Sequence, residues 1–208
     1  MQQILNDLTQ WLAADETIAL ATVVRTKGSS PRPLGSRMAV TASGHMAGSV
    51  SGGCVEGDVF REAQDVLKSG ESRCLEYDAV DEGGWQVGLA CGGAIGVYVE
   101  PLVEAHRGLI DALNREETVG FATRLDGTGH LLAWPDGRVE GDPSLASALL
   151  PLVATEPSPA STAELQARPD ADVFLYANFG AIWGFVQQMS RAEGSGGEEM
   201  RALEAMGL

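Results

Sequence analysis

Two cysteines lie in glycine-rich segments where thiol chemistry is expected. Cys54 closes the segment GSVSGGC (48–54), and Cys91 opens the segment CGG (91–93). Neighbouring glycines let a backbone approach a ligand closely, and amide groups at the start of a helix after Cys54 favour its thiolate form. Soft thiolates suit zinc, copper, iron–sulfur and other soft transition-metal chemistry. Cys54 and Cys91 are therefore the predicted catalytic and metal-binding residues.

The sequence pattern lacks the better-known motifs for zinc, phosphate and dinucleotide binding. A closed zinc site is not predicted, because neither cysteine has a second Cys or His at ligand spacing and the three histidines are scattered. The glycines between 48 and 57 fit neither the Walker A loop nor the dinucleotide fingerprint. An isolated buried cysteine is usually a small hydrophobic residue, and this interpretation fits Cys74, which lies within a strand pattern. No chemical role is assigned to Cys74.

Regular elements can be predicted around these thiols. Apolar, β-branched residues over 17–26 indicate a strand buried on both faces, and apolar spacing after Ser51 indicates a helix that stops at Gly70. If 45–50 and 94–100 are neighbouring antiparallel strands, both cysteine loops lie at one edge of the sheet. Further helices are expected over 2–14, 102–115 and near 144–152, and further strands over 37–40, 73–78, 119–125, 130–135 and 172–178.

This succession of elements predicts the α/β class, with a mixed sheet that contains antiparallel hairpins and is covered by helices. A chain of 208 residues has room for one domain with a substantial core and a small appendage. We expect a single domain over 1–178 and a helical extension over 179–208, which a glycine- and serine-rich stretch interrupts.

Composition limits the classes of partner. A formal net charge of −15 disfavours nucleic acid and anionic membranes, which reward clustered Lys and Arg. No apolar run reaches the roughly 18 residues of a membrane span, and the N-terminus lacks the basic region of a signal peptide. Three cysteines, an odd number, favour reduced thiols over a disulfide framework. A cytoplasmic protein is expected.

One segment departs from the acidic average. Between Glu16 and Glu56 there is no Asp or Glu, while four basic residues fall in the same interval. Two interpretations stay open: an anionic ligand binds this segment, or buried strands simply exclude acidic residues. Burial explains the missing acids but does not explain the bases, which are Arg25, Lys27, Arg32 and Arg37.

Four stretches together resemble the N-terminal domain of the XdhC/CoxI family, accessory proteins of molybdenum hydroxylases such as xanthine dehydrogenase and carbon monoxide dehydrogenase. The resemblance spans roughly residues 5–135. It rests on ALATVVRTKGSSPRPLGSRMAV, GSVSGGCVEGDV, WQVGLACGGAIGVYVEP and FATRL. Its two cysteine motifs follow the GSSPRP loop in the family order.

The resemblance implies a chaperone, more than a turnover enzyme, that binds the molybdenum cofactor (molybdopterin) transiently. It also implies an apo molybdenum hydroxylase and a cysteine desulfurase as partners, and a homo-oligomer is expected. Arg32 and Arg37 would pair with the cofactor phosphate, and Cys54 or Cys91 would contact molybdenum or hold a sulfur in transit. The residues implied in cofactor binding are Ser29, Ser30, Arg32, Arg37, Ser51, Gly52, Gly53, Cys54, Cys91, Gly92 and Gly93.

Longer family members continue into a Rossmann-like domain, whose glycine fingerprint is missing after the strand at 172–178. The sequence is therefore interpreted as a short form, and a separate Rossmann-domain chain is a further expected partner. The alternative is a small thiol-dependent sulfurtransferase or oxidoreductase that uses Cys54 and Cys91. Turnover of a small sulfur donor without cofactor would favour this alternative.

Overall fold

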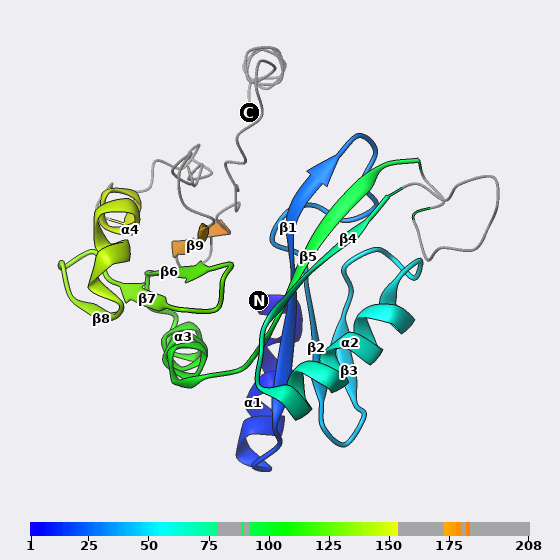
Figure 1. Cartoon of the computed structure of the whole chain (residues 1–208). Coiled ribbons are helices and arrows are strands. Elements are labelled where there is room, and N and C mark those ends of the chain that lie inside the picture. Colours follow the sequence, from blue (N-terminus) through cyan, green and yellow to red (C-terminus); the bar gives the residue numbers. More distant parts are fainter. Residues whose placement is uncertain (79–88, 90–91, 154–172, 180–181, 184–208) are drawn as a thin grey trace.

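The protein consists of two five-stranded sheets with helices between and outside them (Figure 1). The structure is a computed structural model, which describes residues 1–78, 89, 92–153, 173–179 and 182–183. Every strand pairing in these ranges is antiparallel. The predicted α/β class is confirmed, and the strands divide between two sheets instead of forming one.

The first sheet has the strand order β3-β2-β1-β5-β4. Its central strand β1 alternates between two cores, as the two-residue period of a strand requires: Ala19, Ala21 and Val23 face one core, whereas Leu20 and Val24 face the other. The bounds are β1 Ile18–Lys27, β2 Arg37–Thr41, β3 Met46–Gly48, β4 Arg73–Tyr77 and β5 Ala94–Pro101.

Helices cover both faces of this sheet. Helix α2 (Glu56–Ser69) packs one apolar side on the first face and ends at Gly70, which has the left-handed φ of 75° that favours glycine at this position. Helix α1 (Leu5–Ala13), preceded by a 3₁₀ turn η1 (Gln2–Ile4), lies on the opposite face. The predicted helices at both places are confirmed.

The second sheet has the order β10-β9-β6-β7-β8. Helix α3 (Glu104–Asn114) packs on the side that faces the first sheet, and α4 (Ala146–Val153), which follows the 3₁₀ turn η2 (Pro143–Leu145), packs on the other side. The strand bounds are β6 Val119–Arg124, β7 His130–Ala133, β8 Val139–Gly141, β9 Val173–Phe179 and β10 Ile182–Trp183.

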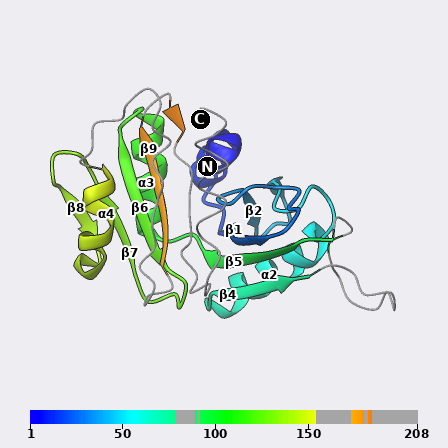
Figure 2. The same ribbon diagram turned by 90° about the horizontal axis from the view of Figure 1, so that it is seen from above.

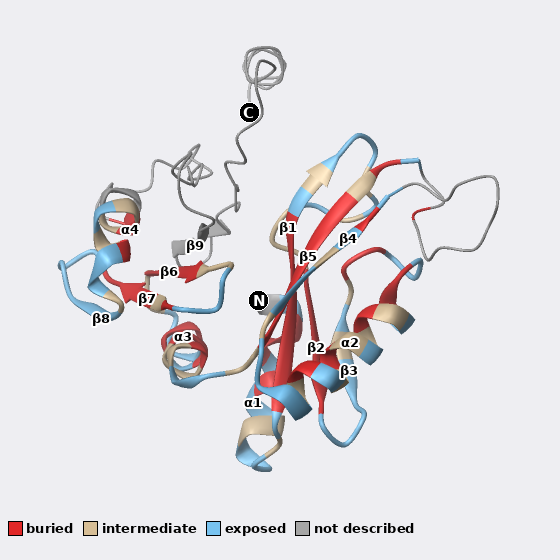
Figure 3. Ribbon diagram, in the orientation of Figure 1, coloured by how far each residue is buried: buried red, intermediate tan, exposed pale blue. Residues whose placement is uncertain are grey.

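Helices α1 and α3 pack on the inner sides of the two sheets, α4 packs on the outer side of the second sheet and α2 on the outer side of the first. The view from above shows the two sheets beside each other (Figure 2). A shared core of buried side chains joins the two sheets through α1 and α3, with Tyr98 of β5 and Phe121 of β6 among its members. The buried residues follow the sheet centres and the inner helix faces (Figure 3). No helix in the described ranges is both long enough and apolar enough to cross a membrane.

Two short strands differ from the sequence prediction. Strand β8 was not predicted, and β10 lies where a helix was expected to begin at 180; the rest of that extension is outside the described residues. The assumed pairing of 45–50 with 94–100 is wrong, because β2 and β1 lie between β3 and β5. Strand order depends on contacts between distant segments, which local periodicity does not contain.

Candidate functional site

One end of the first sheet collects the loops that the sequence analysis selected. The end of β1 is opposite the start of β5, with Lys27 paired to Ala94. The start of β2 lies at this end too, because β2 runs antiparallel to β1, and Gly48 at the end of β3 pairs with Met38. The turn after β1, the loop after β3 and the segment before β5 therefore leave the sheet side by side.

The CGG segment and the GSSPRP turn are in direct backbone contact. A Cβ atom built on Gly93 would lie 2.1 Å from the carbonyl oxygen of Ser29 and 2.9 Å from that of Lys27. Gly28 faces the same contact and has a left-handed φ of 68°. Only glycine allows this approach of two backbones, so the glycine at 93 has a steric reason.

The SGGC segment also lies close to this turn. A Cβ atom on Gly52 would lie 3.9 Å from the Cβ atom of Pro31, which is ordinary van der Waals contact. Both glycine segments thus lie next to the turn at 28–31, although their strands are not neighbours. We call these three segments, 28–32, 49–55 and 92–93, the loop cluster.

The carboxylate of Glu56 turns back from the first turn of α2 into the loop before it. Glu56 is 9% exposed. The donors to its two oxygens are Ser49 Oγ (2.6 Å), Ser51 Oγ, and the amides of Val50 (3.2 Å), Ser51 (2.9 Å) and Gly53 (2.8 Å). Burial alone would raise the pKa of Glu56, but the hydrogen bonds from Ser49 and Ser51 lower this pKa to about 2. The carboxylate is therefore ionised at neutral pH.

This arrangement involves three of the residues implied in cofactor binding, which are Ser51, Gly52 and Gly53. The amides of Ser51 and Gly53 donate to Glu56, and the amide of Gly52 donates to Ser49 Oγ at 2.9 Å. An internal carboxylate takes the place of an external anion, because backbone N–H groups near a helix start can donate to either one.

The predicted basic residues separate into two environments. Arg32 lies in the loop cluster, where its Nη2 donates to Gln3 Oε1 at 2.8 Å and its carbonyl oxygen accepts from Ser30 Oγ at 2.6 Å. Arg37 is buried within β2 and is 6% exposed. Burial of the Met1 amino group lowers the pKa of that group, and the charge of Arg37 lowers it further. Arg32 is thus the better placed of the two for a ligand.

The thiols also differ in setting. Cys54 is exposed at the tip of the SGGC segment, next to Gly53. Cys74 is exposed on the edge strand β4, with its Sγ 3.8 Å from the carbonyl oxygen of Leu125, so the expectation that it is a buried hydrophobic residue is wrong. Cys91 lies outside the described residues, and its approach to Cys54 stays a prediction.

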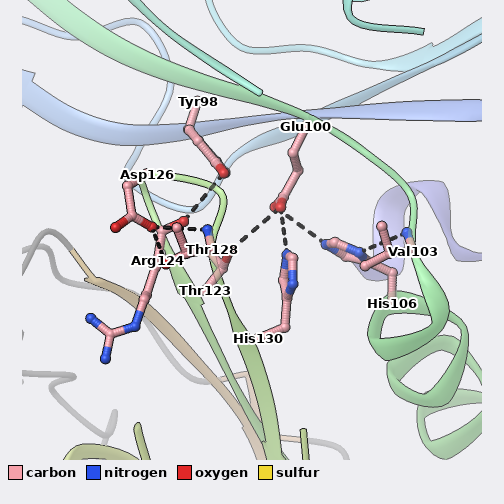
Figure 4. A network of polar contacts seen from close by, with 9 residues as sticks. All are labelled: Tyr98, Glu100, Val103, His106, Thr123, Arg124, Asp126, Thr128 and His130. Carbon is pink, nitrogen blue, oxygen red and sulfur yellow. Dashed lines mark hydrogen bonds and ion pairs between the residues drawn. The ribbon is translucent and has the colours of Figure 1, made fainter. Parts of the chain in front are cut away.

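Sequence reasoning missed one cluster of ionisable side chains. Glu100 of β5 contacts His106 of α3 and His130 of β7, in the region between the two sheets (Figure 4). The histidines had been set aside as scattered because they are 24 positions apart in the sequence. The only local signal was an acidic residue in the otherwise apolar strand pattern of 94–100.

Comparison with known proteins gives a family match over part of the chain. Residues 11–78 match the sequence model of the XdhC and CoxI family. This match contains the GSSPRP turn, the SGGC segment and Glu56. The matched segment runs from α1 to the end of β4, so it supplies two of the three parts of the loop cluster.

Two curated relatives extend the similarity. The chain is 29% identical over 143 residues to a protein of Bacillus subtilis that is named as a probable subunit of xanthine dehydrogenase, and the match covers 62% of this chain and 43% of that protein. It is 36% identical over 116 residues to the "Molybdenum cofactor insertion chaperone PaoD" of Escherichia coli, which covers 55% of this chain and 35% of PaoD. The chain therefore matches less than half the length of either relative.

A solved structure shares the fold over a similar extent. A crystal structure described as a xanthine dehydrogenase from Bacillus halodurans matches with a TM-score of 0.57 and 26% sequence identity. The match covers 66% of this chain and 44% of that one.

Proposed function

We propose that the chain is a molybdenum-cofactor-binding chaperone that helps to mature or insert the cofactor of a xanthine dehydrogenase or carbon monoxide dehydrogenase type hydroxylase. The convergence of the three segments of the loop cluster carries this proposal. Two of them lie within the family segment, and PaoD is by its name a cofactor insertion chaperone. In this function the cofactor is cargo, and an apo hydroxylase and a cysteine desulfurase are the proposed partners.

The residues of the loop cluster fit part of this cargo. A molybdenum dithiolene calls for a soft ligand at the surface, and the Cys54 thiol is exposed beside two glycines. A phosphate calls for basic side chains, and the exposed Lys27 and the half-buried Arg32 flank the turn at 28–31. The loop amides that donate to Glu56 do not fit, so we assign phosphate binding to the basic side chains instead.

Cofactor retention tests the role of the thiol. The protein is incubated anaerobically with released cofactor and desalted, and its molybdenum and pterin contents are measured. The parent protein should retain about one cofactor per binding site, whereas Cys54→Ser should retain roughly tenfold less, because serine offers a neutral hydroxyl in place of a soft thiolate. Cys74→Ser is the matched control, since the thiol of Cys74 is also exposed.

Two outcomes would contradict the proposal. No retention by the parent protein would remove cofactor binding from this chain, and equal loss in Cys54→Ser and Cys74→Ser would indicate nonspecific thiol chemistry. Cys91→Ser belongs in the same series, because the sequence predicts a second thiol at this site.

The basic side of the site makes a separate prediction. Arg32→Gln should weaken cofactor binding about tenfold, the usual loss for one charge-assisted phosphate contact. Arg138→Gln, in the turn between β7 and β8 of the second sheet, should bind as the parent protein does. Titration followed by pterin fluorescence measures both, and equal affinities for the parent and Arg32→Gln would exclude Arg32 from the site.

A further inference from the structure

We propose that Glu100, His106 and His130 form a binding site for a divalent transition-metal ion, at a place separate from the loop cluster. Their ligand atoms all lie within 4.8 Å of one another. The three side chains come from β5, α3 and β7, and they converge on one point between the sheets (Figure 4). Two imidazoles and one carboxylate are the ligand types of open zinc and nonhaem iron sites.

The spacing of the ligand atoms is close to that around a bound metal. His106 Nε2 is 3.2 Å from Glu100 Oε1, and His130 Nε2 is 2.7 Å from Glu100 Oε2. Ligands about 2.0–2.2 Å from a tetrahedral zinc ion lie roughly 3.3 Å apart. These two contacts involve different oxygens of Glu100, and the three ligand atoms lie within 4.8 Å of one another, so a bound metal ion would draw the side chains together by up to about 1.5 Å.

Burial makes this cluster unusual among the described residues. Glu100 is 4% exposed and His106 is 2% exposed, while His130 is 14% exposed and gives a route to solvent. Burial raises the pKa of Glu100, but the contacts with His106 and His130 lower this pKa to about 2. The carboxylate is therefore ionised. Thr123 Oγ1 also points at Glu100 Oε2, at 3.4 Å, and would orient the carboxylate as a ligand.

The protons of the metal-free state are fixed by the hydrogen bonds. The Val103 amide donates to His106 Nδ1 at 3.2 Å, and burial lowers the pKa of His106, so neutral His106 carries its proton on Nε2 and donates it to Glu100. Binding of a metal at Nε2 would move this proton to Nδ1. The Val103 amide would then lose its acceptor at the start of α3, where Val103 is 37% exposed and near water.

Metal binding should therefore leave a spectroscopic mark. Purified protein is freed of metal with a chelator and titrated with Zn²⁺ by calorimetry, with Co²⁺ absorption to show whether nitrogen and oxygen or sulfur atoms are ligands. We expect one ion per chain, no sulfur ligand, and a change of the His106 tautomer from Nε2–H to Nδ1–H in ¹⁵N NMR. Zn²⁺ should also raise the melting temperature, because it binds the folded state.

Variants of the cluster make the test specific. His130→Ala and Glu100→Gln should each lower the Zn²⁺ affinity at least about 100-fold, more than loss of an outer partner does, and should abolish the rise in melting temperature. His45→Ala is the control, since His45 is exposed in the turn between β2 and β3. Circular dichroism checks that each variant is folded. If Glu100→Gln does not fold, His130→Ala still tests the metal site.

The proposal is overturned if the parent protein binds no Zn²⁺ or Co²⁺, or if the cobalt spectrum shows sulfur ligation. It is also overturned if His130→Ala binds as the parent does, or if the His106 tautomer stays Nε2–H in the Zn²⁺ complex. The cluster would then be a metal-free set of hydrogen bonds to a buried carboxylate. These results do not depend on cofactor retention by the loop cluster.

Discussion

Gly93→Ala is expected to destabilise the protein by about 3 kcal/mol, at the upper end of the cost of overpacking. The added methyl group would lie 2.1 Å from the carbonyl oxygen of Ser29, and the atom in its way belongs to a backbone, so no side chain can rotate aside. The turn after β1 and the start of β5 would have to separate. Urea unfolding followed by fluorescence measures the change in the free energy of unfolding.

Gly57→Ala provides the matched control for this substitution. Gly57 lies in the first turn of α2, and a Cβ atom built there meets nothing within 4 Å. The same added methyl group should leave the free energy of unfolding unchanged or raise it by up to about 1 kcal/mol, because alanine favours a helix over glycine. Equal stability of Gly93→Ala and the parent protein would mean that the backbone contact between Gly93 and Ser29 does not exist.

The fold was predictable where one segment carries enough pattern by itself. The apolar, β-branched run of β1 indicated a strand buried on both faces, and the apolar spacing and Gly70 defined α2. Strands β8 and β10 have only three and two residues. They exist as strands because β7 and β9 offer free edges, so their own residues gave no signal.

The sequence selected the glycine segments of the loop cluster but did not predict how they meet. They come together at the turn 28–31 and not through paired strands. An acidic residue in the first turn of α2 indicated only a favourable helix dipole. That Glu56 folds back onto the preceding loop depends on side-chain direction, and the Glu100 cluster depends on three elements that the chain brings together from far apart.

Glu56→Gln is expected to destabilise the protein by about 2 kcal/mol at neutral pH. The hydroxyl groups of Ser49 and Ser51 and the amides of Val50, Ser51 and Gly53 all direct hydrogen atoms at the two oxygens of Glu56. A carboxamide keeps one oxygen and presents an NH₂ group, so donors would face donors inside a buried loop. We also expect weaker cofactor retention, because Gly53 and Cys54 would no longer be held in place.

The destabilisation should depend on pH with a defined sign. The pKa of Glu56 falls from an ordinary value of 4.5 to about 2 in the folded protein, so its ionised form contributes stability at pH values above about 4.5. This contribution, about 2 kcal/mol after allowance for solvent near the loop, is lost as pH falls from 4.5 towards 2. The difference in unfolding free energy between the parent and Glu56→Gln should therefore shrink over that interval, and parallel urea titrations at several pH values measure it.

Glu62→Gln separates this effect from a general loss of negative charge. Glu62 lies on the same helix and pairs with Arg73 at 2.7 Å on the surface, where an ion pair contributes at most about 1 kcal/mol. Both variants remove one charge from a chain of net charge −15, so their shared effect is on self-repulsion. Two results would show that the Glu56 carboxylate does not hold the SGGC segment in place. One is a Glu56→Gln variant as stable as Glu62→Gln, and the other is a loss of unfolding free energy in Glu56→Gln that is as large at pH 2 as at neutral pH.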